Sequence, residues 1–133
     1  MPNIEEQNLT EFLLEVKAKM ANITTSENNE INDINQYVLK NSGKFIRSKI
    51  IYLYGSEIGV TKLKLIELAS AAELIHLSTL IHDDIIDEAD LRRDMPTVVK
   101  KWGIKKAILY GDFLYTKTCL LYTSDAADES SGV

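Results

Sequence analysis

The chain has 133 residues and a formal net charge of −5, with 15 lysines and arginines against 20 aspartates and glutamates. At this length one domain is the default, and 45% hydrophobic with 26% charged residues is a globular rather than a disordered composition. The acidic balance argues against a nucleic-acid-binding protein, and a single cysteine excludes an intramolecular disulfide and is typical of a reducing compartment such as the cytoplasm.

The first two segments are predicted to be helical. Apolar residues recur three and four positions apart over residues 4–22, which predicts an amphipathic helix, and this segment lacks the basic start and apolar core of a signal peptide. The polar run TTSENN interrupts the pattern. A shorter helix follows, and Asn41-Ser42-Gly43 is typical of its C-terminus.

The central part of the chain predicts two further helices. The third carries apolar residues from Phe45 onward and closes at Gly59. Thr61 is a suitable N-cap for a long helix through about residue 87, which is apolar on most sides and is therefore expected at the centre of the fold. Polar residues within its most apolar window argue against a transmembrane segment: Lys64, Glu67, Glu73 and His76.

The C-terminal third predicts a loop and two helices. Residues 88–96 are charged and end in a proline, which indicates a loop, and Thr97 is expected to cap a short helix that ends at Gly103. A last helix runs from Ile104 to about Thr118, and Gly111 inside it indicates close packing. No alternating strand pattern and no repeat is found, so the predicted class is all-α.

The strongest chemical signal is the acidic motif DDIID at the end of the long helix. Asp83 and Asp87 are four residues apart and project from one helix face, which Asp84 flanks. Carboxylates packed so closely repel one another, and Mg²⁺ removes that cost while filling its coordination sphere with water and substrate phosphate. The alternative is a solvated acidic helix end, although acidic residues oppose the helix dipole there.

Two basic patterns accompany the acidic motif. Arg92 and Arg93 follow in the loop, and their planar guanidinium groups match phosphate oxygens, so together with Mg²⁺ they suggest a diphosphate ligand. The alternative is a pair of surface arginines bound to neighbouring carboxylates, namely Glu88, Asp90 or Asp94.

The segment SGKFIR is the second basic pattern. Gly43 allows backbone to approach an anion, with Lys44 and Arg47 on the following turn, but the segment is not a Walker A loop. His76 lies two turns before Asp83 on the same helix and would by itself be read as a core histidine. Glu73 is expected to be buried and therefore to need a hydrogen-bonding partner.

The order and the amino-acid sequence of these motifs resemble those of one protein family. The segments GKFIRSK, ELIHLSTLIHDDIIDEADLRRDMPTVVKKWG and AILYGDFLY resemble the trans-isoprenyl diphosphate synthases, or polyprenyl synthetases, including octaprenyl and polyprenyl diphosphate synthases. The resemblance covers about residues 41–118. It implies a cytoplasmic, homodimeric prenyltransferase of isoprenoid biosynthesis, whose all-α bundle surrounds a deep cavity and condenses an allylic diphosphate with isopentenyl diphosphate.

The resemblance also implies roles for the acidic motif and for Arg92. Asp83, Asp84 and Asp87 would form the first aspartate-rich motif and act in catalysis, with Asp83 and Asp87 as the main Mg²⁺ ligands. Arg92 would hold the allylic diphosphate and act in catalysis with them.

Binding of the second substrate falls to other residues. The resemblance implies that Lys44, Arg47, His76 and Arg93 bind isopentenyl diphosphate. Ser78 corresponds to a position that faces the growing chain, where bulky aromatic residues stop growth early. A small residue there implies a product longer than farnesyl.

The chain departs from the family pattern in several places. Ser48 stands where the family usually has proline, and Asp94 stands where it usually has glycine. The family's second aspartate-rich motif is missing, so we interpret residues 1–118 as the N-terminal part of a truncated domain and expect the fragment to be inactive. Residues 119–133 include CLLYTSDAADE, which resembles a translated sequencing adapter, and this tail is expected to be non-native and to pack poorly.

Two other functions compete with this interpretation. A non-catalytic helical partner subunit would also carry an incomplete site. An HD-type metal phosphohydrolase is suggested by His82-Asp83, but that class needs further histidine ligands, and the chain has two histidines, both on one predicted helix.

Overall fold

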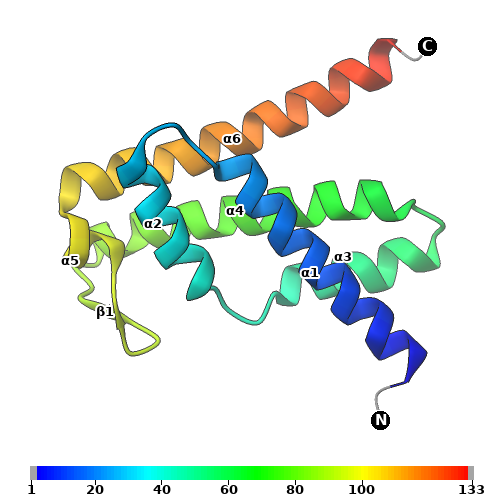
Figure 1. Ribbon diagram of the computed structural model, residues 1–133, viewed down its shortest axis with the longest axis horizontal. Coiled ribbons are helices and arrows are strands. Elements are labelled where there is room, and N and C mark those ends of the chain that lie inside the picture. The colour runs from blue at the N-terminus through cyan, green and yellow to red at the C-terminus, as the bar shows by residue number, and fades with distance from the viewer. Residues whose placement is uncertain (1–2, 132–133) are drawn as a thin grey trace.

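The computed structural model describes the backbone of residues 3–131 and the side chains of residues 3–121. Six helices and one short hairpin make up this part of the chain (Figure 1). In order they are α1 (Ile4–Thr24), α2 (Asn29–Lys40), α3 (Ile46–Glu57), α4 (Lys62–Ile86), β1 (Leu91–Arg92), β2 (Met95–Pro96), α5 (Val98–Trp102) and α6 (Ile104–Ser131). The predicted all-α class and the order of the predicted helices are confirmed.

Local side chains fix where most helices begin. Asn3 and Glu6 form a reciprocal capping box at the start of α1, in which each side chain accepts the other residue's backbone N–H. Thr61 caps α4 and Thr97 caps α5, as the sequence predicted. These caps satisfy N–H groups that have no partner inside their own helix.

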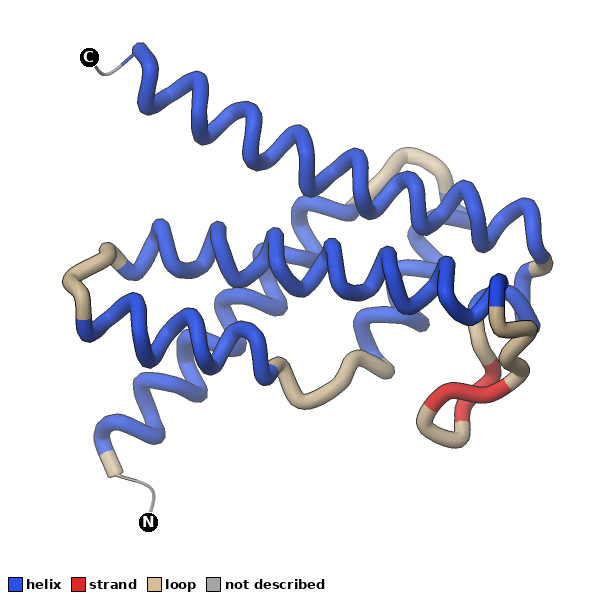
Figure 2. Tube along the Cα trace, turned by 180° about the vertical axis from the view of Figure 1, so that it is seen from behind, coloured by secondary structure: helices blue, strands red, loops and turns tan. Residues whose placement is uncertain are grey.

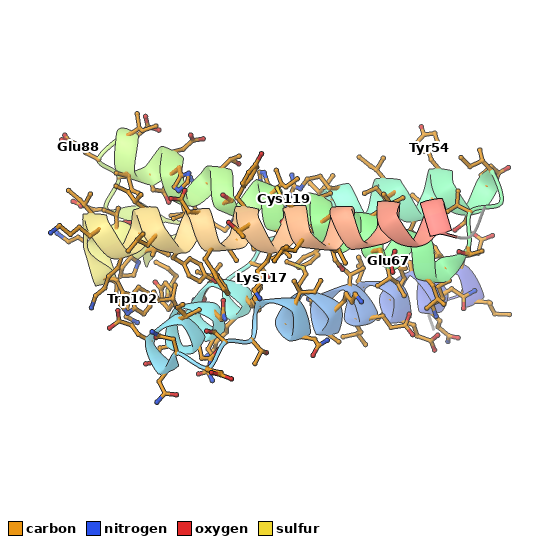
Figure 3. All side chains as sticks on the ribbon, turned by 90° about the horizontal axis from the view of Figure 1, so that it is seen from above. Tyr54, Glu67, Glu88, Trp102, Lys117 and Cys119 are labelled. Atoms are coloured by element: carbon orange, nitrogen blue, oxygen red, sulfur yellow. The ribbon has the colours of Figure 1, made fainter. Side chains whose placement is uncertain are left out.

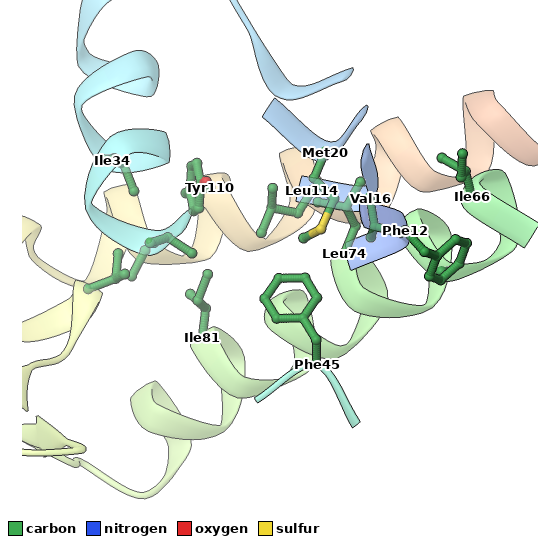
Figure 4. Close-up of a cluster of buried hydrophobic side chains, with 14 of the residues drawn as sticks. Phe12, Val16, Met20, Ile34, Phe45, Ile66, Leu74, Ile81, Tyr110 and Leu114 are labelled. Carbon is green, nitrogen blue, oxygen red and sulfur yellow. The ribbon is translucent and has the colours of Figure 1, made fainter. Parts of the chain in front are cut away.

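The long helix α4 lies at the centre of the bundle and contacts α1, α3, α5 and α6 (Figure 2). Apolar side chains from α1, α2, α4 and α6 meet around it with the buried Phe45 to form one core (Figure 4). By length and composition α4 could cross a membrane, and it is the one such helix among the described residues. A buried core helix meets the same criterion, and the central position of α4 accounts for its apolar character.

The loop predicted over residues 88–96 contains a hairpin, so the prediction of no strands was wrong here. Leu91 pairs with Pro96 and Arg92 pairs with Met95 in antiparallel register. The two residues between them have φ values of 51° and 64°, which is the geometry of a tight hairpin turn. Two-residue strands are too short to show an alternating pattern in the sequence.

The last helix extends past its predicted end near residue 118 and reaches Ser131. No proline or glycine follows Gly111 within α6, so nothing in the sequence forces the helix to stop. Figures 1 and 2 show α6 diverging from α4 toward its C-terminus. Cys119, in the predicted tail, is free and exposed (Figure 3), and the tail's side chains beyond residue 121 lie outside the described residues.

Candidate active site

A cleft lies where the α2–α3 loop, the middle of α4 and the β1–β2 hairpin meet. It encloses about 700 Å³, counting its open mouth. Its apolar lining comes mainly from α1, α2, α4 and β2, and its acidic, basic and imidazole side chains are Arg47, Glu73, His76, Asp84, Arg92 and Arg93. Converging cationic groups beside apolar surface suit a ligand with an anionic head and an apolar chain.

Arg92 is held by a carboxylate from α4. Asp84 faces inward from the last turn of α4 and is only 6% exposed. Arg92 donates two hydrogen bonds to it, from Nε to Oδ2 at 3.0 Å and from Nη2 to Oδ1 at 2.7 Å. The hydrogen bonds to Asp84 raise the pKa of Arg92, and burial opposes them. Arg92 therefore pairs with Asp84 rather than with the loop carboxylates that the sequence left open.

Arg93 packs against backbone from the other side of the cleft. A Cβ atom built on Gly43 would overlap the guanidinium of Arg93, so the glycine leaves the space that this guanidinium fills. The sequence suggested that backbone at Gly43 approaches an anion. The group that approaches is a cation, which lines the cleft at that point.

Arg47 and Ser48 lie in the first turn of α3 and contact a buried glutamate of α4. Glu73 is 4% exposed, and its Oε1 accepts hydrogen bonds from Ser48 N at 3.2 Å and Ser48 Oγ at 3.1 Å. The Nε atom of Arg47 lies 3.4 Å from the same oxygen. The expectation that Glu73 is buried and partnered is confirmed.

His76 is half-buried on the cleft side of α4. Desolvation lowers the pKa of His76, the charge of Arg47 lowers it further, and Glu73 partly counters both effects. Arg92 and Arg93 also lower it. A neutral imidazole is therefore favoured while the cleft holds no anion, and an anion bound among these arginines would favour its protonation.

Asp83 and Asp87 lie at the C-terminal end of α4, and both are exposed. Asp87 is the C-cap, and its backbone N–H donates to the carbonyl of Asp83 at 2.8 Å. Among the described side chains no group of three histidines, cysteines, aspartates and glutamates is arranged to hold a metal ion. Two exposed carboxylates one turn apart still fit Mg²⁺, because this ion takes one or two protein carboxylates and completes its shell with water and phosphate. Asp84, in contrast, is buried and accepts a hydrogen bond from Arg92 at each of its oxygens.

Besides Asp83 and Asp87, two predicted site residues lie outside the cleft lining. Lys44 is exposed in the loop before α3. It directly follows Gly43, which lines the cleft, but is itself outside the lining. Ser78 is buried between α4 and α6, where its hydroxyl donates to the carbonyl of Gly111 at 2.8 Å. Gly111 also lies against the imidazole of His82, which confirms the close packing expected at this glycine.

The sequence did not predict the hydrogen bonds that join the elements around the cleft. The hydroxyl of Tyr37 donates to the carbonyl of Pro96 at 2.6 Å and so ties α2 to the hairpin. Ser48 and Glu73 tie α3 to α4 in the same way. No local pattern marks these pairs. The one available signal was Glu73 itself, a carboxylate on an otherwise apolar helix.

The chain is similar to known proteins over most of its length. The family model of the polyprenyl synthetases matches residues 28–129, past the predicted start of the tail. The chain is 42% identical over 88 residues to a geranylgeranyl diphosphate synthase from Methanosarcina mazei, which is 66% of this chain and 27% of that protein. It is 36% identical over 94 residues to the octaprenyl diphosphate synthase of Escherichia coli, or 71% and 29% of the two chains.

A third relative is component 2 of a heptaprenyl diphosphate synthase from Geobacillus stearothermophilus, 34% identical over 111 residues, which cover 83% of this chain and 34% of that protein. Among solved structures, a decaprenyl diphosphate synthase from Rhodobacter capsulatus aligns with a TM-score of 0.83 and 30% identity, over 89% of this chain and 37% of that one. A polyprenyl synthase from Caulobacter crescentus, complexed with calcium and isoprenyl diphosphate, aligns with a TM-score of 0.82 and 25% identity, over 89% and 36%.

Proposed function

The chain belongs to the polyprenyl synthetase family, and on that premise we propose that the whole protein condenses an allylic diphosphate with isopentenyl diphosphate into a longer trans-polyprenyl diphosphate. The observation that carries the proposal is the convergence of Arg47, Arg92, Arg93 and His76 on one cleft with apolar walls. That cleft offers cations for two diphosphates and a dry surface for a prenyl chain.

Each cationic residue has a proposed role. Arg92, oriented by Asp84, binds the allylic diphosphate and stabilises the charge that grows on it as it leaves. Arg47, His76 and Arg93 bind isopentenyl diphosphate from the other side, and Lys44 attracts it from the exposed loop. The apolar walls exclude water, which would otherwise capture the cationic allylic carbon before the double bond attacks.

Asp83 and Asp87 are proposed to hold Mg²⁺. The ion, when bound, neutralises charge on the departing diphosphate. Asp84 is proposed to contribute to catalysis by orienting Arg92, which donates a hydrogen bond to each of its oxygens.

Product length is proposed to depend on Ser78. Its side chain is small and buried, and it lies five residues before Asp83 on α4. Ser78 lies outside the cleft lining, so the proposal of a product longer than farnesyl rests on the resemblance, in which a small side chain at this position permits further growth. We further propose that the whole protein is a cytoplasmic homodimer.

The chain by itself is proposed to be catalytically inactive. It spans 27% and 29% of the length of the two curated synthases described first, and one DDxxD motif occurs in its sequence. Large apolar side chains of α3 and α4 are exposed, as expected where more of a bundle packs, and the most exposed of them are Tyr54, Leu63 and Ile86. The Geobacillus relative is one component of a heptaprenyl diphosphate synthase, which favours a helical partner subunit as the second candidate.

Incorporation of labelled isopentenyl diphosphate by the full-length protein tests the proposal. Geranyl and farnesyl diphosphate would be supplied with Mg²⁺, and chain elongation that stops when the ion is chelated is the expected result. The absence of elongation with either primer would contradict the synthase. Restoration of elongation by a second protein from the same source would support the partner subunit instead.

A further inference from the structure

We propose that Glu73 is a positioning residue: by capping the first turn of α3, it holds Arg47 in the orientation in which the guanidinium faces the cleft. Glu73 acts through Arg47 and needs no contact with substrate. The inference rests on the proposed function in one respect, namely that Arg47 binds a diphosphate.

The helix α3 begins without a cap of its own. Its N-cap residue, Phe45, has a left-handed φ of 56° and makes no side-chain cap hydrogen bond, and no acidic residue lies in the first turn. The first N–H groups of a helix need an acceptor from elsewhere, and the positive end of the helix dipole favours an anion there.

Glu73 supplies both the acceptor and the anion from the neighbouring helix. One of its oxygens, Oε1, accepts the backbone N–H and the hydroxyl of Ser48, which is fully buried. A buried carboxylate without partners is unfavourable, so the contact also stabilises Glu73. The hydrogen bonds between Ser48 and Glu73 therefore hold the first turn of α3 against α4 at the position of Glu73.

Arg47 takes its position from this junction. It precedes Ser48 in the first turn, and its Nε lies 3.4 Å from Oε1 of Glu73 without making a hydrogen bond to it. Among the described residues no hydrogen bond from its terminal Nη atoms is found, and the side chain lines the cleft. The ion pair thus restrains the arginine near its stem and leaves the terminal donors available to an anion.

A purely electrostatic account makes the opposite prediction. Glu73 lines a cleft that is proposed to bind an anion, and by Coulomb's law its negative charge weakens anion binding. Removing that charge would then strengthen binding whatever Arg47 does. The positioning role instead predicts that the effect of removing it depends on whether Arg47 is present.

A double-mutant cycle separates the two accounts. Inorganic pyrophosphate would be titrated calorimetrically into the 133-residue chain and into its Glu73→Gln, Arg47→Gln and doubly substituted variants. In the Arg47→Gln background, we expect Glu73→Gln to strengthen pyrophosphate binding. In the background that keeps Arg47, the change in affinity caused by Glu73→Gln should be less favourable by at least about threefold, a coupling typical of residues in contact. Equal strengthening in both backgrounds would overturn the proposal.

A second measurement needs no ligand. Nuclear magnetic resonance would follow the Nε–H signal of Arg47 and the exchange of the first amides of α3. Glu73→Gln removes the charge but keeps an oxygen acceptor, so it should broaden that signal and speed amide exchange by up to about fivefold, the effect of losing an anion beside a helix N-terminus. Ser48→Ala should have a weaker effect of the same kind. Ser70→Ala is the matched control, because Ser70 is also fully buried but its hydroxyl has no hydrogen-bond partner among the side chains that the structure describes.

The two measurements distinguish the inference from the proposed function. If the unchanged chain binds no pyrophosphate while Glu73→Gln loosens Arg47, the diphosphate role of the cleft fails and the positioning role stands. If Arg47 and the first turn of α3 are unchanged in both Glu73→Gln and Ser48→Ala, the positioning role is wrong.

Discussion

Replacing Gly43 with alanine is expected to weaken anion binding with little loss of stability. The new Cβ would occupy the place of the Arg93 guanidinium, and the flexible end of that side chain is what must move. Gly43 does not have a left-handed φ, so alanine adds no backbone strain. If Arg93 loses one charge-assisted contact with a bound diphosphate, the cost is about 1.5–3 kcal/mol, or about tenfold to a hundredfold in affinity.

Calorimetric titration of the chain with inorganic pyrophosphate measures the affinity, and urea unfolding followed by circular dichroism measures the stability. Gly111→Ala is the control, because its Cβ would overlap the His82 imidazole where α4 and α6 pack. It should destabilise the fold by about 1–3 kcal/mol and leave the affinity of folded protein unchanged. Unchanged pyrophosphate affinity in folded Gly43→Ala would refute the placement of Arg93 in the binding site.

The remaining predictions concern the other groups at the cleft. Asp84→Asn removes the carboxylate that orients Arg92 but also a negative charge that opposes anion binding, so in the same titration its effect on pyrophosphate affinity should be less favourable by at least about threefold when Arg92 is present than in the Arg92→Gln background; equal effects in both backgrounds would contradict the orienting role. In the full-length protein Asp83→Ala should reduce kcat by about a hundredfold to a thousandfold with little change in isopentenyl diphosphate binding, and near-normal turnover would remove its metal role. Lys44→Ala should mainly raise the KM for isopentenyl diphosphate in steady-state assays, and a fall in kcat alone would be inconsistent with this. Because the pKa of His76 is lowered in the folded chain, its neutral form stabilises the fold fully above about pH 6.5, and this contribution falls as the pH drops below that value. His76→Gln should reduce the acid sensitivity measured by urea unfolding between pH 7 and 5, and an unchanged pH profile would show that another group governs it.

Much of the fold could be predicted from the sequence because helices are encoded locally. The threonine caps at Thr61 and Thr97 lie where the sequence placed them, and the break at Gly103 separates α5 from α6. The hairpin was missed because its strands are two residues long and its turn holds Arg93 and Asp94 in place of the usual glycine. Asp94 has a positive φ, which explains physically why glycine suits this position.

The sequence alone determined which residue types the candidate site would contain. Acidic residues four apart at the end of an apolar helix and two consecutive arginines after it indicated a diphosphate site, and Arg92, Arg93, Arg47 and His76 do meet in one cleft. The acidic motif and the pair of arginines needed only helical spacing and the chemistry of single side chains, whereas the binding roles of Arg47 and His76 were implied by the family resemblance.

Only the tertiary structure decided which group holds each arginine. Arg92 had several acidic neighbours in sequence and pairs with Asp84, while Arg47 lies against Glu73 and Arg93 fills the space left by Gly43. The last two contacts join segments far apart in the chain, so they depend on how α3 and the hairpin pack against α4. Spacing along one helix fixes which side chains share a face, but the partner across the cleft is set by the packing of separate elements.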